Sequence, residues 1–159
     1  MQAEGASQDY SVDNIEAFIG KNIGVSRWHI VSQQEICDFA SATHDLDPNH
    51  IDPDWAREHS PYGFPIAFGF QSLSLLTYLC KDAGLKPSGT TDEYNYGFDK
   101  VRFLAPVPAD CRVRTHVALK DARRKGSSAI VLRYEVSMEI EGGDKPALVA
   151  DWLVMCGLN

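Results

Sequence analysis

The chain contains 159 residues, enough for one domain with a sizeable core and too few for two ordinary domains. Hydrophobic residues make up 44% and charged residues 23% of it, values that are typical of a folded globular protein and exclude a disordered one. The formal charge of −7 disfavours nucleic acid as a partner, because the phosphate backbone repels an acidic surface.

The first third of the chain predicts a frayed end, a strand and a helix. Residues 1–10 are polar and are expected to fray, whereas residues 24–31 predict a strand. Ser32 and Glu35 then form an S-x-x-E capping box, in which each side chain satisfies a backbone amide at the start of a helix. Apolar residues at helical spacing extend this helix to about Thr43.

A polar loop and the most hydrophobic helix of the chain follow. Residues 44–60 are crowded with Asp, His and Pro, which predicts a loop with a brief helix near residues 54–59. Loops of this composition contain binding or catalytic residues more often than residues of the hydrophobic core. From Ile66 to Ala83 apolar residues surround the helix axis, so we expect a helix that is buried on nearly all sides. Gly84 is its expected end.

From about residue 95 the pattern changes to strands. Four segments alternate in polarity or are rich in β-branched residues, namely residues 96–103, 112–122, 128–140 and 147–155. Their connectors are too short for parallel crossovers, so we predict an antiparallel meander. The fold class is therefore α+β, with one antiparallel sheet wrapped around one long central helix in a single domain over residues 1–159.

The chain shows no sign of export, membrane insertion or a disulfide framework. Its longest apolar stretches, such as residues 73–80, are shorter than a membrane span. The residues before Lys21 lack the basic start and the apolar core of a secretory signal. No C-x-x-C pair occurs among the cysteines, which stand far apart at Cys37, Cys80, Cys111 and Cys156. We therefore expect a cytoplasmic protein with reduced thiols and no membrane association.

The loop of residues 44–60 is the candidate site, because it concentrates imidazoles and carboxylates: His44, Asp45, Asp47, His50, Asp52 and Asp54. A solvated polar loop would explain this composition, and a metal site is a second interpretation. Pro48 interrupts any helix that could bring His44 and His50 to one face. Neither H-E-x-x-H spacing nor the glycine of a calcium loop occurs, so we expect no metal.

A third interpretation pairs Asp45 with His50. The two residues stand five positions apart around a turn stiffened by Pro48, so both side chains can point into one cavity. An imidazole titrates near neutral pH, and a partly desolvated carboxylate can be tuned towards it. Such a pair can take a proton from water. The loop therefore predicts a water-activating site.

Residues 44–53, HDLDPNHIDP, resemble the hydratase signature G-D-x-N-P-x-H-x-D of the MaoC-like dehydratases, the (R)-specific enoyl-CoA hydratase group. The segment FPIAFG at residues 64–69 is similar to the P-I-x-H-G helix start of this family. VRFLAPVP at residues 101–108 is similar to its F-x-x-P-V strand end. Order and spacing match over roughly residues 20–157, and the nodulation-protein-N-like members are the subgroup that the chain resembles. The resemblance implies a hot-dog fold that pairs edge to edge as a homodimer.

The resemblance also implies catalytic roles. Asp45 and His50 match the dyad that activates water, and Gly69 matches the glycine whose amide holds the thioester oxygen. An amide at the start of a buried helix is a fixed donor, and the missing side chain permits close approach. The implied reaction is reversible hydration of 2-enoyl-CoA thioesters to 3-hydroxyacyl-CoA, on CoA or an acyl-carrier protein, without a cofactor. A hot-dog acyl-thioesterase and a non-catalytic acyl-thioester binding module are the alternatives.

Three residues beside this machinery are candidates for substrate binding. Asp47 stands where the family has Asn, and Phe68 stands where it has His before Gly69. The first change adds a carboxylate and the second removes a hydrogen-bonding side chain. Thr77, two helical turns after Gly69, can line an acyl pocket or bond to its own backbone.

Basic residues are candidates for contact with a CoA phosphate. Arg102 is one of them, on the strand that precedes the connector with Pro106. Others supply local positive charge in this acidic chain, at Arg112, Arg114, Arg123, Arg124 and Lys125. A solvated face is the alternative for each.

Overall fold

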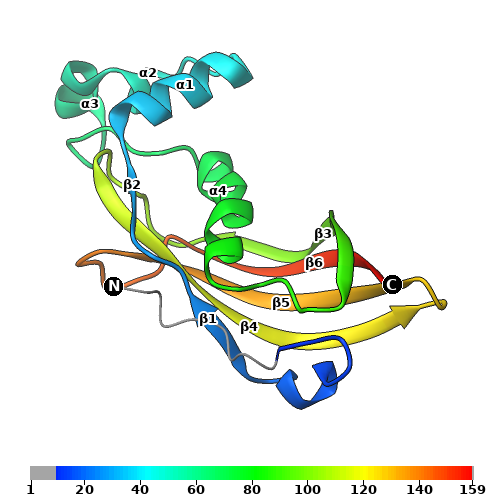
Figure 1. Cartoon of the computed structure of the whole chain (residues 1–159). Helices are drawn as coiled ribbons and strands as arrows, with labels where there is room; N and C mark the ends of the chain where they lie inside the picture. Colours follow the sequence, from blue (N-terminus) through cyan, green and yellow to red (C-terminus); the bar gives the residue numbers. More distant parts are fainter. Residues whose placement is uncertain (1–9, 159) are drawn as a thin grey trace.

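Figure 1 shows the computed structural model of the chain, which describes residues 10–158. One twisted antiparallel sheet of six strands curves around a long helix, and three shorter helices lie beyond one end of that helix. The predicted α+β architecture is therefore confirmed. Of the predicted frayed segment, residues 1–9 lie outside the described part, whereas Tyr10 is buried and its hydroxyl lies 2.9 Å from that of Tyr134. No helix in residues 10–158 is long and apolar enough to cross a membrane.

The helices are the short 3-10 helix η1 (Ile15–Phe18), α1 (Gln33–Thr43), α2 (Pro48–Ile51), α3 (Pro53–His59) and the central α4 (Gly69–Asp82). The strands are β1 (Asn22–Val25), β2 (His29–Val31), β3 (Thr90–Phe103), β4 (Cys111–Lys125), β5 (Ala129–Ile140) and β6 (Leu148–Leu158). The two long hairpins β4–β5 and β5–β6 form the body of the sheet.

Helix α1 begins and ends where the sequence predicts. The Ser32 hydroxyl accepts the backbone N–H of Glu35, and the Glu35 carboxylate accepts the backbone N–H of Ser32 at 2.9 Å. The prediction of one strand over residues 24–31 is wrong in one respect, because the structure has two strands there, β1 and β2. Between them the Ser26 hydroxyl accepts the backbone N–H of Thr115 at 2.9 Å, in place of a backbone carbonyl. This side chain interrupts the regular ladder with β4.

The four long strands do not form the simple meander that the connectors predicted. Strand β3 pairs with β6, which gives the order β1-β4-β5-β6-β3. The segment of residues 104–110 must therefore cross three strand spacings, roughly 14 Å, and seven extended residues can span about 24 Å. On its way the Val107 carbonyl accepts the N–H of Ala67 at 2.8 Å. This crossover runs directly past the start of α4.

Helix α4 packs one side on the sheet and leaves the other open. Leu76, Leu79 and Cys80 are buried against the inner face of the sheet. Phe70 and Tyr78 are 72% and 57% exposed. The prediction that this helix is buried on nearly all sides is therefore wrong for a single copy of the chain. A single curved sheet covers only one face of a helix, which leaves large apolar groups uncovered.

Candidate functional site

The acidic loop after α1 folds into two short helices, and two of its carboxylates cap them. Asp47 accepts the backbone N–H of Asn49 at 2.9 Å at the start of α2. Asp52 accepts the N–H groups of Asp54 and Trp55 at the start of α3. Each cap precedes a proline at the first helical position, where the missing N–H costs nothing. Much of the acidity of this loop is therefore structural.

His50 lies on α2 and is held in a defined orientation. Its Nδ1 lies 2.7 Å from the Ile66 carbonyl oxygen. A carbonyl can only accept, so Nδ1 carries the proton and donates. In the neutral ring the lone pair is then on Nε2. The side-chain amide of Gln33 on α1 donates to the His50 backbone carbonyl at 2.8 Å and fixes α2 in place.

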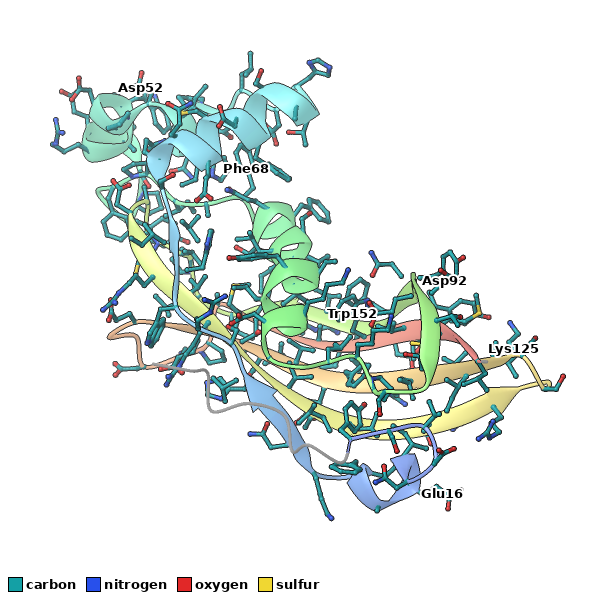
Figure 2. All side chains as sticks on the ribbon, in the orientation of Figure 1. Glu16, Asp52, Phe68, Asp92, Lys125 and Trp152 are labelled. Carbon is teal, nitrogen blue, oxygen red and sulfur yellow. The ribbon has the colours of Figure 1, made fainter. Side chains whose placement is uncertain are left out.

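Phe68 supports the same ring from a second side. It is 5% exposed, lies between α1 and the start of α4 (Figure 2), and stacks on His50 with ring centroids 3.8 Å apart. Phe39 on α1 packs against Phe68 with a centroid separation of 5.3 Å. Hydrogen bonding and stacking together restrict the imidazole to one position.

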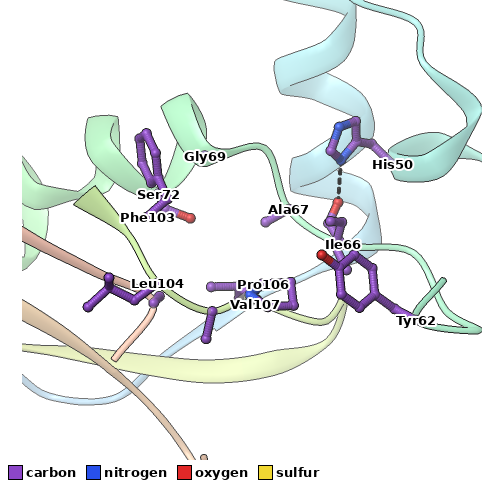
Figure 3. A pocket seen from close by; sticks show the side chains of 12 residues that line it. His50, Tyr62, Ile66, Ala67, Gly69, Ser72, Phe103, Leu104, Pro106 and Val107 are labelled. Atoms are coloured by element: carbon purple, nitrogen blue, oxygen red, sulfur yellow. Dashed lines mark hydrogen bonds between the residues drawn. The ribbon is translucent and has the colours of Figure 1, made fainter. Parts of the chain in front are cut away.

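His50 faces a cavity of about 270 Å³ between α2, the start of α4 and the crossover before β4 (Figure 3). Its walls are mostly apolar, with the Tyr62 and Ser72 hydroxyls as further polar groups. The lining residues are His50, Tyr62, Ile66, Ala67, Gly69, Ser72, Phe103, Leu104, Ala105, Pro106, Val107 and Ala147. Two of the predicted catalytic residues, His50 and Gly69, therefore line one cavity.

Gly69 is the first residue of α4, so its N–H has no partner within the helix. The N-cap residue Phe68 offers no side-chain acceptor, and the Gly69 N–H forms no hydrogen bond within residues 10–158. A Cβ at this position would lie 3.3 Å from the Phe103 ring. Gly69, which lines the cavity, therefore has a free N–H donor at the positive end of the helix dipole.

Asp45 lies outside this cavity. Its side chain is exposed, and its Oδ1 accepts the backbone N–H of Asp47 at 3.4 Å. Across the described residues no hydrogen bond joins Asp45 to His50. The structure thus brings His50 and Gly69 together and leaves Asp45 on the solvent side of the loop.

The remaining predicted residues also lie away from the cavity lining. Asp47 is the exposed cap of α2, and Phe68 supports His50 from behind. Thr77 is about 12 Å further along α4 than Gly69 and lines a separate cavity of about 80 Å³ beside Trp152. Arg102 is exposed, and its guanidinium donates to the Val101 carbonyl at 2.8 Å.

Two polar residues of the cavity were not singled out as site residues from the sequence. Tyr62 comes from the loop between α3 and α4 and is 45% exposed. Ser72 is buried in the first turn of α4, where its hydroxyl donates to the Phe68 carbonyl at 3.3 Å. Their proximity to His50 depends on how α2 folds back on α4, which local sequence patterns do not encode.

Comparison with known proteins supports the resemblance. The family model described as MaoC like domain matches residues 14–139. Nodulation protein N of Rhizobium meliloti is 38% identical over 151 residues, which cover 95% of this chain and 94% of that protein. The 3-hydroxyacyl-thioester dehydratase Z of Mycobacterium tuberculosis is 38% identical over 144 residues, 91% of this chain and 94% of that protein.

A solved structure shares the fold. The crystal structure of the MaoC-like dehydratase from Rhodospirillum rubrum superposes with a TM-score of 0.73 at 18% sequence identity. The match covers 89% of this chain and 93% of that one. The arrangement of sheet and central helix is therefore that of the hot-dog proteins.

Proposed function

The chain belongs to the MaoC-like dehydratase family, a family of hydro-lyases, and we propose that it hydrates 2-enoyl thioesters reversibly to 3-hydroxyacyl thioesters. The acyl group is carried by CoA or by an acyl-carrier protein. The observation that carries this proposal is the pairing, across one cavity, of an oriented imidazole with a free helix-start amide. The first can move a proton and the second can stabilise a developing oxyanion.

His50 acts in this proposal through Nε2. Because the Ile66 carbonyl holds the proton on Nδ1, the lone pair of Nε2 is available to accept a proton from water. Stacking on Phe68 prevents the ring from turning away when it becomes charged. Phe68 is thus a positioning residue, and the aromatic contact replaces the hydrogen-bonding side chain found in the family pattern.

Asp45, which is exposed on the loop that leads to His50, is the second member of the proposed dyad. In the hydration direction the dyad of Asp45 and His50 takes one proton from water as the water oxygen bonds to C3. The electrons of the double bond move onto the thioester oxygen, which the Gly69 N–H stabilises. A proton from the dyad then adds to C2. Water is thereby added across the bond with no net change in the protein.

The direct test is an assay of the unmutated protein on a panel of 2-enoyl-CoA substrates, from short to long and branched acyl chains. If the protein is a hydratase, we expect loss of the enoyl absorbance with no release of free thiol. Thiol release while the double bond persists would instead indicate a thioesterase. Saturable binding of acyl-CoA without turnover would indicate a non-catalytic binding module.

Replacing Asp45 by asparagine should lower turnover by about 10²-fold or more, because the amide cannot accept a proton at neutral pH. The side chain is exposed and accepts only a long backbone hydrogen bond, so the fold should be unaffected. Turnover is measured on the best enoyl-CoA of the panel, with circular dichroism as the check on folding. Asp47→Asn is the matched control, since Asp47 caps α2 outside the cavity and its amide oxygen can still accept the Asn49 N–H. Turnover of Asp45→Asn close to that of the unmutated protein would remove Asp45 from the mechanism.

We also propose that two copies pair through strand β3 in a cytoplasmic homodimer. Strand β3 lies at one end of the sheet, so its outer backbone groups are available to a second strand. Large exposed side chains gather on β3 and the open side of α4: Phe70, Tyr78, Tyr94 and Phe103. The Phe70 and Phe103 rings touch, and Phe103 also lines the cavity, so a second copy here would cover the cavity wall. The described cysteines are all free, as expected in a reducing compartment.

Light scattering should give a mass about twice the 17.6 kDa of one chain, and Phe70→Asp should shift the protein towards a single copy. Phe70 is 72% exposed, so the charge disturbs only a surface that a partner would cover. Leu46→Asp is the control, because Leu46 is 64% exposed on the loop after α1. A mass of one chain for the unmutated protein would contradict the dimer.

A further inference from the structure

A second cavity, of about 350 Å³, opens on the outer face of the sheet. Its floor is formed by Val131 and Leu153, which alternate with buried residues that face α4. Its rim includes Tyr96 on β3, and Arg124 and Lys125 at the end of β4. Lys125 lies at the end of the sheet remote from α1 and α3 (Figure 2). The two cavities share no lining residue.

The rim of this outer groove has more positive charge than its carboxylates neutralise. Arg123 is paired with Asp121 at 2.6 Å, and Arg133 with Asp151 at 2.8 Å and with Asp99 at 3.5 Å. Within residues 10–158, Arg124 and Lys125 form no ion pair. Two uncompensated cations therefore border a cavity in a chain whose net charge is −7. An anionic ligand would neutralise them.

The backbone of β3 directs an aromatic ring towards these cations. Tyr94 is paired with Met155, which lies on the same outer face of β6 as Leu153. Because side chains alternate between the faces of a strand, Tyr96 also points to the outer face. A register irregularity follows between Asn95 and Gly97, with Gly97 at a φ of 153°. Tyr96 thus lines the outer groove.

Tyr96 and Lys125 form one preorganised contact. The Lys125 ammonium donates to the Tyr96 hydroxyl at 2.9 Å and lies 4.8 Å from the centre of its ring. The hydrogen bond from Lys125 lowers the pKa of this hydroxyl. Tyr96 nevertheless remains 49% exposed, so much of its surface can contact a ligand. Pairing of β3 with a second copy would use backbone groups and leave this outer face open.

We propose that the outer groove binds a nucleotide. Its phosphates contact Arg124 and Lys125, and its base packs on Tyr96 over the apolar floor of Val131 and Leu153. The volume lies within the range of small-molecule sites, and the mixture of apolar floor and few charged groups is typical of them. The same chemistry occurs in a free nucleotide and in the nucleotide part of CoA. The site does not depend on the proposed hydratase activity.

Calorimetric titration of the full chain with ADP tests this site. We expect saturable binding that Arg124→Ala/Lys125→Ala weakens at least about tenfold, because two charged contacts are lost. Arg124→Lys/Lys125→Arg should keep most of the affinity. Arg57→Ala/Lys145→Ala removes the same charge from exposed positions outside the groove and should have no effect. Absence of saturable ADP binding, or equal weakening by the two alanine pairs, would overturn the proposal.

Two further titrations locate the ligand and identify its source. His50→Gln should bind ADP as the unmutated protein does, and a loss there would place ADP in the first cavity and overturn the proposal. Competitive displacement of ADP by CoA would identify the nucleotide part of CoA as a ligand of the groove. Simultaneous binding of both would restrict the groove to free nucleotides.

Discussion

Replacing His50 by glutamine should lower turnover of an enoyl-CoA substrate by about 10²- to 10⁴-fold, the usual contribution of a positioned general base. Glutamine is close to histidine in size, and its amide can still donate to the Ile66 carbonyl that Nδ1 contacts at 2.7 Å. It cannot accept a proton from water near neutral pH. The variant therefore removes the chemistry of Nε2 while retaining the structure around it.

His59→Gln is the matched control for this experiment. His59 also places Nδ1 near a backbone carbonyl, that of Trp55 at 3.1 Å, and its ring also stacks on an aromatic side chain. It lies on α3 and does not line the cavity, so its loss should leave turnover unchanged. Equal effects of the two substitutions, or near-normal turnover in His50→Gln, would show that His50 is not the base.

Replacing Gly69 by proline should lower turnover by about 10²- to 10³-fold, as expected for the loss of one oxyanion donor. Proline is favoured at the first position of a helix and lacks the N–H. The preceding residue, Phe68, has a ψ of 141°, which is a conformation that a following proline permits. The substitution therefore deletes the proposed donor with little change to the backbone.

Gly69→Ala distinguishes loss of the N–H donor from loss of the space that the missing side chain provides. Alanine retains the N–H but adds a Cβ that would lie 3.3 Å from the Phe103 ring, as proline also does. We expect alanine to raise KM through crowding and proline to lower kcat much further. Equal losses of kcat in both variants would mean that bulk, and not the amide, explains the effect.

Local patterns predicted the elements that depend on local physics. The capping box at Ser32 follows from backbone amides that nearby side chains satisfy, and α1 ends at Thr43 because His44 adopts a left-handed conformation with a φ of 61°. The short helices α2 and α3 were only partly predicted, although Asp47 before Pro48 is itself a cap signal. Two aspartates of this loop, Asp47 and Asp52, cap these helices, which is a structural role that the interpretation of a solvated polar loop did not include.

Long-range packing explains what the sequence did not predict. Nothing local distinguishes a strand that pairs with the next strand from one that pairs with β6, so the crossover of residues 104–110 was missed. That crossover forms one wall of the cavity. His50 and Gly69 were expected to share a cavity and do so, whereas the pairing of Asp45 with His50 stays a prediction.

The proposed role of His50 depends on which of its nitrogens carries the proton, and nitrogen-15 NMR of histidine-labelled protein measures this directly. The His50 signals are identified by their absence from the His50→Gln spectrum. In the neutral ring we expect a protonated Nδ1 that donates to the Ile66 carbonyl, and an unprotonated Nε2. A neutral ring with its proton on Nε2 would have its lone pair on Nδ1, against the Ile66 carbonyl, and would contradict the proposed base.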